Sequence, residues 1–356
     1  MTSFSPDCFP ILIGSLPVTD HRAASDMVLQ ATPQIPVWAQ LPVYPIEGMV
    51  PQFAGGMPGL VMEDDRIFID LDRSDFENEL AAFYEDYLAV TEGEAPMEGS
   101  RFALGKKAAG GFHELLGRVR HLDPPPIALK GQVTGPITFG LGLKDQRGRG
   151  IFYDPNARDA AVKLLALKAA YQVRALAAAG APVMIFQDEP ALAGYGSSEM
   201  ISISGDEIAA SLGEINTAIH AEGGLAGIHV CANTDWGMIL GTGVDIVNFD
   251  TFSYFDRFLL YGEQIKRFIG EGGIIAWGLV PTGSPEALQE ATPASLAQRW
   301  EAQCKALVDL GVDRKQLRAQ SLISPSCGVG SLSLAQAQKV LDLTREVSAR
   351  IRGRGV

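Results

Sequence analysis

Cysteine is scarce in this chain, and no two cysteines stand close together. The four residues are Cys8, Cys231, Cys304 and Cys327, and no Cys-x-x-Cys pair occurs among them. A small disulfide-stabilised fold and a zinc finger both need closely spaced cysteines, so the sequence excludes both classes. We therefore expect no disulfide bonds in this protein.

Basic residues and long apolar runs are also in short supply. Lys and Arg number 29 against 42 Asp and Glu, which leaves a net charge of −13. Such a surface repels phosphate backbones, so nucleic acid is not an expected partner. No apolar run approaches the roughly 20 residues of a membrane-spanning helix, and the first residues lack the basic and apolar segments of a secretory leader. We expect a cytoplasmic protein with no membrane partner.

What the chain does contain is a series of short apolar segments rich in Ile and Val, as in strands buried on both faces. Its 356 residues fit one large α/β barrel or two smaller domains. Helical patterns separate several of the segments, notably at 154–179 and 296–310, each followed by Gly. Alternating strands and helices predict a (β/α)8 barrel. The eight candidate strands lie at 11–15, 35–40, 127–132, 183–187, 226–231, 245–249, 274–278 and 319–323.

The region 42–126 interrupts this alternation after the second candidate strand. It is too long for a single loop between a strand and a helix. Its pattern predicts a β-hairpin over 60–70 and helices over 75–90 and 107–119. We interpret it as an insertion that covers the mouth of a single barrel domain spanning residues 1–356.

Three candidate strands end in residues that bind soft or borderline metal ions. His229 and Cys231 close one strand, Asp250 follows the next, and Cys327 follows the last. The C-terminal ends of barrel strands share one rim, so these side chains are expected to converge. Imidazole, thiolate and carboxylate together are typical zinc ligands. Asp250 is either the fourth ligand or an acceptor that orients His229.

Each of these residues also has an ordinary structural interpretation. His and free Cys are often buried in cores, so the His-x-Cys pattern gains its weight only with Cys327 at another strand end. Cys304 lies in an amphipathic helix and is interpreted as structural. Asp188 and Glu189 form either a functional acid pair at the rim or an acidic pair favoured by a helix dipole. Ser15 binds substrate or caps the segment that follows.

Several motifs together resemble the catalytic, C-terminal half of cobalamin-independent methionine synthase. They occur in the family's order and extend over nearly the whole chain; the specific ones are the Asp-Glu-Pro-Ala segment and the His-x-Cys plus Cys-Gly pair. The motifs are PILIGSLP at 10–17, VTGPIT at 133–138, FQDEPAL at 186–192, His229-x-Cys231 and Pro325-x-Cys327-Gly328.

This resemblance implies a (β/α)8 barrel with a catalytic zinc ion. Carried over by position, it makes His229, Cys231 and Cys327 zinc ligands, and it places Asp250 where the family has a glutamate ligand. It also implies that Asp188 holds the amino group of homocysteine and that Ser15 lies near the homocysteine carboxylate. Glu189, beside Asp188 in the same motif, is a further candidate for substrate binding.

The chain departs from the family pattern in two respects. It lacks the N-terminal half that helps to bind the folate donor, and shortened relatives of this kind are associated with methyl transfer from a methylated corrinoid protein. Pro51 stands where the family carries a second glutamate that grips the homocysteine amine. The resemblance therefore implies a zinc-dependent thiol S-methyltransferase. Its expected donor is a methylcorrinoid on a partner protein, and its acceptor is homocysteine or a similar small thiol.

Three other functions stay open on the sequence. A methylcobamide:coenzyme M type methyltransferase also uses His-x-Cys and a distant Cys. A uroporphyrinogen-decarboxylase-like enzyme needs arginines to hold many carboxylates, and only Arg22 occurs among the first 65 residues. A non-enzymatic barrel that stores or shuttles a metal ion would bind zinc without turnover.

Overall fold

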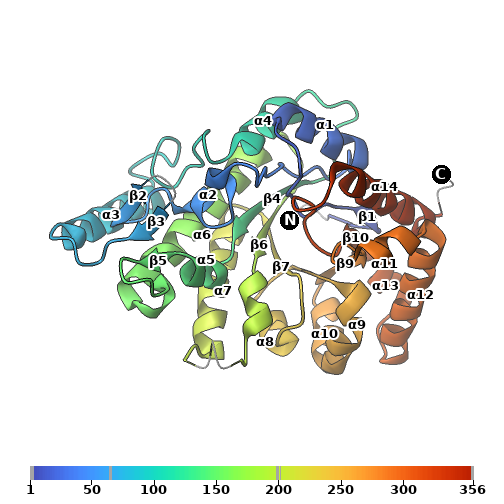
Figure 1. Cartoon of the computed structure of the whole chain (residues 1–356). Coiled ribbons are helices and arrows are strands. Elements are labelled where there is room, and N and C mark those ends of the chain that lie inside the picture. Colours follow the sequence, from blue (N-terminus) through green and yellow to red (C-terminus); the bar gives the residue numbers. More distant parts are fainter. Residues whose placement is uncertain (1–3, 64–65, 198–199, 201, 354–356) are drawn as a thin grey trace.

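One curled parallel sheet forms the centre of the computed structural model, which describes residues 4–63, 66–197, 200 and 202–353. Helices surround this seven-stranded sheet (Figure 1). All neighbouring strands pair in parallel. In spatial order the strands are β1 (Phe9–Pro10), β10 (Ser321–Pro325), β9 (Ile274–Val280), β8 (Ile246–Phe249), β7 (Leu225–Val230), β6 (Val183–Asp188) and β4 (Leu129–Thr134).

The eighth position of the expected barrel is not a regular strand. The segment 35–40 makes only isolated bridges, one from Gln40 to Ser15 and one from Val37 to Lys130. A regular ladder fails here because Pro36 has no backbone N–H to donate. The predicted strand at 11–15 is corrected as well, since β1 covers Phe9–Pro10. The other six predicted strands overlap β4 and β6 to β10 within a few residues.

The helices alternate with the strands, and most begin at a residue that caps them. Asp20, Asp154 and Ser333 each accept a hydrogen bond from the first turn of the helix that follows. No helix in the described part of the chain is both long and apolar enough to cross a bilayer. The helices are α1 (His21–Ala31), α2 (Pro51–Ala54), α3 (Phe76–Thr91), α4 (Gly110–Val119), α5 (Pro136–Gly142), α6 (Pro155–Ala177), α7 (Gly205–Ala221), α8 (Trp236–Leu240), α9 (Thr251–Phe258), α10 (Gly262–Gly270), α11 (Pro285–Glu290), α12 (Pro293–Asp309), α13 (Arg314–Ala319) and α14 (Leu334–Ile351).

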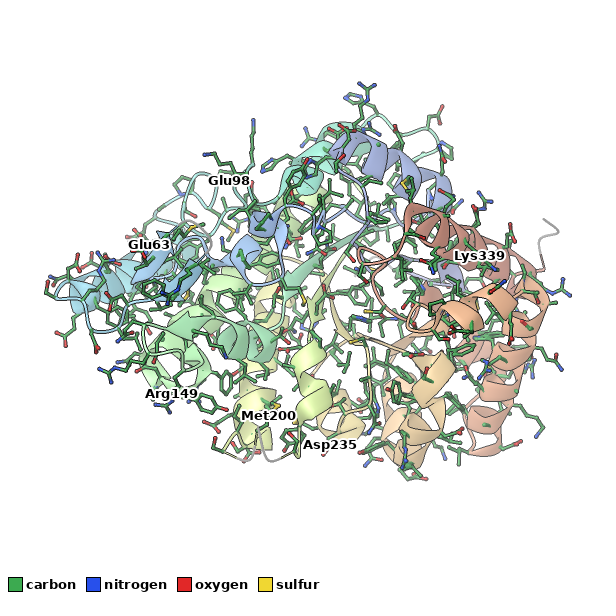
Figure 2. The ribbon with its side chains drawn as sticks, in the orientation of Figure 1. Glu63, Glu98, Arg149, Met200, Asp235 and Lys339 are labelled. Carbon is green, nitrogen blue, oxygen red and sulfur yellow. The ribbon has the colours of Figure 1, made fainter. Side chains whose placement is uncertain are left out.

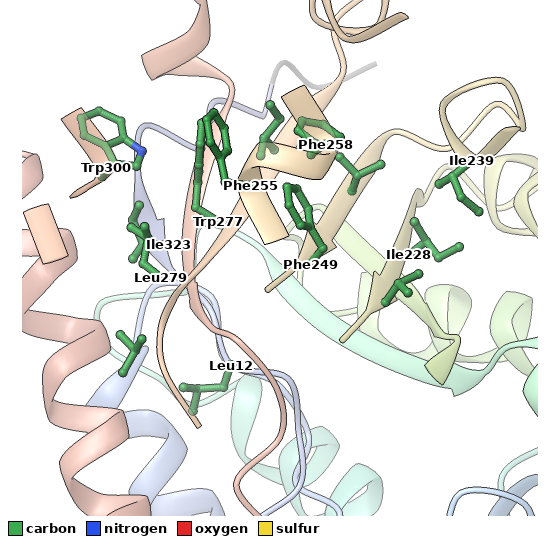
Figure 3. Packing of buried hydrophobic residues seen from close by; sticks show 14 of the residues in the cluster. Leu12, Ile228, Ile239, Phe249, Phe255, Phe258, Trp277, Leu279, Trp300 and Ile323 are labelled. Carbon is green, nitrogen blue, oxygen red and sulfur yellow. The ribbon is translucent and has the colours of Figure 1, made fainter. Parts of the chain in front are cut away.

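Apolar side chains fill both sides of the sheet. On the outer side, Phe249 of β8 contacts Phe258 of α9, and Trp277 of β9 meets Trp300 of α12 edge to face (Figure 3). A smaller cluster includes Phe186, Ile246 and Leu322 from three strands and also Ile35 from the bridging segment. Residues from so many strands meet only on the enclosed face of the curled sheet. This apolar layer therefore supports the polar strand ends from below.

The region 42–126 follows the bridging segment, as expected. Its hairpin consists of β2 (Leu60–Glu63) and β3 (Arg66–Ile69), and β5 (Lys144–Asp145) extends this small sheet. The turn at 64–65 lies outside the described residues. The hairpin and α3 project to one side of the main sheet in Figure 1. Exposed charged side chains such as Glu63, Glu98 and Arg149 occupy the outer surface (Figure 2).

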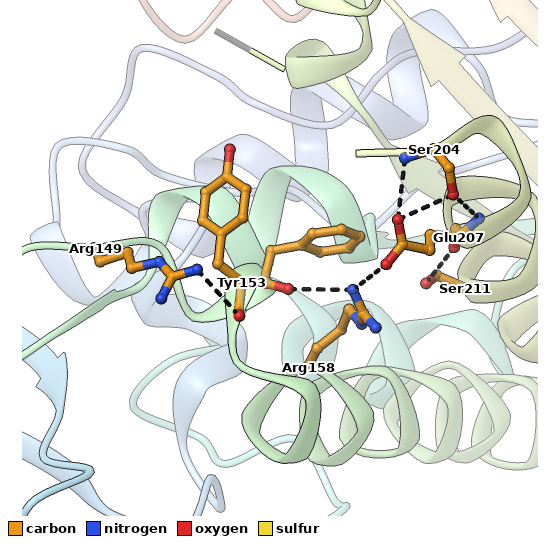
Figure 4. Close-up of polar contacts among 7 residues, drawn as sticks. Arg149, Tyr153, Arg158, Ser204, Glu207 and Ser211 are labelled. Atoms are coloured by element: carbon orange, nitrogen blue, oxygen red, sulfur yellow. Dashed lines mark hydrogen bonds and ion pairs between the residues drawn. The ribbon is translucent and has the colours of Figure 1, made fainter. Parts of the chain in front are cut away.

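An ion pair joins neighbouring helices α6 and α7. Arg158 Nη1 lies 2.7 Å from Glu207 Oε1, and Glu207 also completes a capping box with Ser204 (Figure 4). Both side chains are partly exposed, so this ion pair adds little to the free energy of unfolding and mainly orients the two helices. It aligns two helices that flank β6 and β7, whose ends carry candidate site residues.

Candidate metal centre

Two parallel strands place three potential ligands at one end of the sheet. His229 is the penultimate residue of β7, Cys231 follows that strand directly, and Cys327 lies two residues after β10. One ligand atom from each residue lies within 4.8 Å of the others. His229 is buried, whereas the two cysteines are half-buried. The fold therefore gathers one nitrogen and two sulfur donors from positions nearly a hundred residues apart.

Asn248 fixes the orientation of the His229 ring. The two residues are register partners on β7 and β8, and His229 Nδ1 lies 2.6 Å from Asn248 Oδ1. Asn248 Nδ2 donates to Ser324 Oγ and to the carbonyl of Ala276, so its Oδ1 is the atom left to accept from the ring. Nδ1 then carries the proton, and Nε2 presents its lone pair.

The Nε2 atom of His229 is buried and has no hydrogen-bond partner among the described residues. Burial lowers the pKa of His229 to about 4, against the opposing effect of the Asn248 hydrogen bond. The imidazole is therefore neutral at physiological pH. A buried, unpaired lone pair beside two thiols is costly unless something binds it.

The two thiols interact with each other. A sulfur–sulfur hydrogen bond lowers the pKa of Cys231 to about 7 and, with burial, raises that of Cys327. Neutral imidazole and thiolate are the donor forms that zinc requires. The donor set and the unpaired Nε2 atom together fit a zinc ion.

Asp250 takes a different place from the one expected. It is the N-cap of α9, and its Oδ1 accepts a hydrogen bond from Ser253 N at 2.9 Å. Burial raises the pKa of Asp250, and hydrogen bonds from Ser253 oppose that shift. The structure does not bring Asp250 into the cluster of His229, Cys231 and Cys327. The acceptor on His229 Nδ1 is Asn248, which sequence reasoning gave no role.

Asp188, the last residue of β6, is buried beside the three ligands. Its register partner is His229, and its Oδ1 atom has no hydrogen-bond partner in the described structure. Burial raises the pKa of Asp188 to about 7, and the buried ammonium of Lys130 opposes this rise. Lys130 Nζ donates to the carbonyl of Ile13 at 2.7 Å and lies over the ring of Phe186. An unpaired carboxylate oxygen at this position suits a cationic group on a ligand.

Glu189 points away from the cluster. Its two carboxylate oxygens accept hydrogen bonds from Ile137 N, Thr138 N and Thr138 Oγ1 at 2.6 to 2.9 Å. A side chain on Gly135 would collide with it, so that glycine leaves the space it occupies. Burial raises the pKa of Glu189 to about 7, although these hydrogen bonds lower it. Glu189 caps α5 and joins the ends of β4 and β6; its contacts are with protein groups.

A cavity of about 300 Å³ opens beside the ligands, within the range for small-molecule sites. Ser15 lines it, and Ser15 Oγ accepts a hydrogen bond from Gly330 N in the loop after Cys327. Sequence reasoning passed over Asn248, Gln40 and Lys130. For Asn248 and Lys130, the available signal was a polar residue inside a predicted strand that is mainly apolar, and for Gln40 it was a polar residue at the end of such a segment. The polar residues that line the cavity are Ser15, Gln40, Glu47, Asp188, His229, Cys231, Cys327 and Ser331.

Two solved structures show a distant likeness to this chain. No protein-family model matches the chain, and no curated protein matches it either. A B12-independent methionine synthase from Shewanella sp. W3-18-1, solved with selenomethionine, is 18% identical over 67% of each chain, with a TM-score of 0.45. A modular endo-β-1,4-mannanase from Cellulomonas fimi is 14% identical over 65% of this chain and 66% of that chain, with a TM-score of 0.26. At these TM-scores, the function of this chain has to be argued from its own site.

Proposed function

We propose that this protein is a zinc-dependent thiol S-methyltransferase whose acceptor is homocysteine or a similar small aminothiol. The observation that carries the proposal is the cluster of His229, Cys231 and Cys327 beside the cavity, with the buried Nε2 lone pair of His229 unpaired. A zinc ion bound by these residues lowers the pKa of a thiol that enters the cavity, so that the sulfur is nucleophilic at neutral pH.

The residues around the cluster have separate tasks under this proposal. Asn248 holds the His229 ring with Nε2 toward the cluster. Asp188 binds the ammonium group of the acceptor through its unpaired Oδ1. Ser15 holds the loop after Cys327 and lines the cavity where the rest of the acceptor lies. The buried apolar side chain of Ile13 also lines the cavity and limits the contact of the reacting sulfur with water.

The charge of the cavity favours this acceptor over two alternatives. Its lining residues in the described chain include Asp188 and Glu47 but no Lys or Arg. Two acids repel the sulfonate of coenzyme M. A porphyrinogen with many carboxylates needs several cationic partners, which this cavity lacks. An aminothiol matches the charge of the site.

Two further expectations from the sequence become proposals here. We propose that segment 35–40 acts as the eighth strand of a (β/α)8 barrel, and that residues 1–356 form one domain with 42–126 as its insertion. The bridge of Val37 to Lys130 in β4 and that of Gln40 to Ser15 in the segment after β1 support the first. Pro42, Glu47 and Met49, at the start of the insertion, line the cavity and support the second.

A turnover experiment tests the function directly. The zinc-loaded protein is incubated with homocysteine or coenzyme M and with methylcobalamin or methyltetrahydrofolate as the donor. The methylcorrinoid donor stays a prediction from the sequence, so both donors are included. We expect methionine from homocysteine with one donor, loss of product on zinc removal and recovery on zinc addition. Absence of a methylated thiol with every combination would overturn the proposal. A methylated coenzyme M alone would favour that alternative acceptor.

A further inference from the structure

A thiol that reacts as a thiolate has to lose one proton. The path of this proton out of the cavity therefore matters only under the proposed function, on which this inference rests. The sulfur keeps the electron pair of the broken S–H bond, and the proton needs an acceptor within the cavity. The cavity is lined mainly by apolar groups and backbone, so a retained proton would oppose the negative charge on sulfur. A path that carries the proton to solvent is therefore part of the chemistry.

Two carboxylates line the cavity, and they differ in whether a hydrogen bond connects them to a group exposed to solvent. Asp188 Oδ1 has no hydrogen-bond partner among the described residues, and no hydrogen bond leads outward from that oxygen. Glu47 is 3% exposed, and its Oε1 lies 2.6 Å from His21 Nε2. The side chain of His21 is 27% exposed. Glu47 and His21 thus connect the cavity to solvent through one short hydrogen bond.

Neighbouring residues fix the positions of the Glu47 and His21 side chains. Glu47 Oε2 accepts a hydrogen bond from Leu41 N at 2.9 Å, which fixes the carboxylate. The ring of Tyr44 stacks on His21 at 6.0 Å between centroids, and the Tyr44 hydroxyl donates to the carbonyl of Thr19. A side chain on Gly110 would come within 2.6 Å of His21 Nε2, so a glycine at this position leaves room for the imidazole ring. Each Glu47 oxygen keeps a second lone pair for a proton from the cavity.

We propose that Glu47 and His21 form a proton relay that carries the acceptor thiol's proton from the cavity to solvent. The S–H bond breaks, its electron pair stays on sulfur, and the proton binds a Glu47 oxygen directly or through one water. Glu47 passes a proton to the unprotonated Nε2 atom of His21, the resulting imidazolium releases its Nδ1 proton to water, and proton exchange with solvent restores the starting tautomer. The relay then returns to its starting charge. No oxidant or further reactant takes part.

Stopped-flow mixing tests the relay without turnover. The protein is loaded with cobalt(II) in place of zinc and mixed with homocysteine in weak buffer. Cys231 and Cys327 already give a cobalt–sulfur absorption band, so its increase on mixing reports binding of the added thiolate, and a pH indicator reports the released proton. The variants are Glu47→Gln, which keeps the shape of the carboxylate, and His21→Ala, which leaves space for added imidazole. The matched control is His220→Ala, because His220 pairs with Asp245 at 2.7 Å on the surface, away from the cavity.

We expect both relay variants to bind thiol and release the proton at least tenfold more slowly, since positioned acid–base groups typically contribute about 10²–10⁴ in rate. Added imidazole should restore His21→Ala but not Glu47→Gln, and His220→Ala should match the wild type. Wild-type rates in both relay variants would overturn the relay. So would a slow His21→Ala protein that imidazole leaves slow, because that marks a purely structural role. If the cobalt–sulfur absorption of the wild type does not increase when homocysteine is added, the proposed function fails and the relay falls with it.

Discussion

His229 and Asn248 face each other on neighbouring parallel strands, and 2.6 Å separates His229 Nδ1 from Asn248 Oδ1. This contact turns the Nε2 atom toward Cys231 and Cys327. It also explains why an asparagine occurs within the apolar strand β8. Its side-chain amide forms hydrogen bonds with residues of three other strands, β7, β9 and β10. The metal cluster is therefore supported by a buried polar network as well as by its own ligands.

Zinc content tests the cluster itself. We expect about one zinc per chain in the wild type and almost none in the Cys231→Ser/Cys327→Ser double variant, because two of the three ligands are removed. Cys304→Ala is the control, since Cys304 is buried in α12 outside the cluster. Elemental analysis of the purified proteins measures the zinc content per chain. Equal zinc in the double variant and the wild type would contradict this site.

Asn248→Ala tests the orientation of the imidazole. The ring loses its acceptor and is free to turn, so zinc affinity should fall by about 10–100-fold. Competition with a coloured chelator measures the affinity. Asn216→Ala is the matched control, because Asn216 is also buried and pairs with Gln187 by a hydrogen bond of 2.7 Å. A similar zinc affinity in Asn248→Ala and Asn216→Ala would show that this hydrogen bond does not position His229.

Gly328→Ala tests the packing of the loop that carries Cys327. A methyl group at this position would collide with Ser15 Oγ and push the loop away from the segment that follows β1. We expect zinc affinity to fall by about tenfold or more. Gly283→Ala is the control, because nothing lies within 4 Å of the methyl group there. Competition with the coloured chelator again measures the zinc affinity. An unchanged zinc affinity in Gly328→Ala would show that the loop adapts without moving Cys327.

Asp188→Asn tests recognition of the acceptor's amine. Removing the charged partner should weaken homocysteine binding by roughly tenfold to a hundredfold, about 1.5–3 kcal/mol. Binding of 4-sulfanylbutanoate, which lacks only the amine, should hardly change. Calorimetric titration of both thiols into both zinc-loaded proteins gives the comparison. Equal losses for the two thiols would assign Asp188 a role other than amine binding.

Lys168 gives the protein a distinctive stability at alkaline pH. Burial lowers the pKa of Lys168 from 10.5 to about 8, and among the described residues its Nζ donates to the carbonyls of Arg101 and Ala103. Between pH 8 and 10.5 the unfolded chain binds more protons at this group than the folded chain, so stability rises with pH. Below pH 8 the buried charge costs its full amount, roughly 3 kcal/mol.

The variant Lys168→Met isolates this contribution, since it keeps the length of the side chain without its charge. We expect Lys168→Met to be at least as stable as the wild type at pH 7, and relatively less stable as the pH rises toward 10.5. Urea unfolding of both proteins at several pH values measures the difference. Parallel stability curves for the two proteins would contradict the lowered pKa.

The sequence alone was enough to locate the elements that carry the site. Short Ile- and Val-rich segments mark β6 to β10 because strands buried on both faces need continuous apolar side chains. His229, Cys231 and Cys327 were identifiable because polar residues at the ends of such strands stand out from their surroundings. Regular local patterns of this kind are encoded within a few neighbouring residues.

Only the tertiary structure decided which polar side chains meet. Asp250 and Asn248 are two residues apart and would share a face if the strand continued, but β8 ends at Phe249, so Asn248 reaches His229 while Asp250 caps α9. Glu189 follows Asp188 directly and still turns to the N-terminus of α5. Glu47 reaches the cavity from a single 3-10 turn, Pro45–Glu47, which is too short to show a periodic pattern. These contacts depend on strand register and loop path, which join residues far apart in the chain and leave no local signal in it.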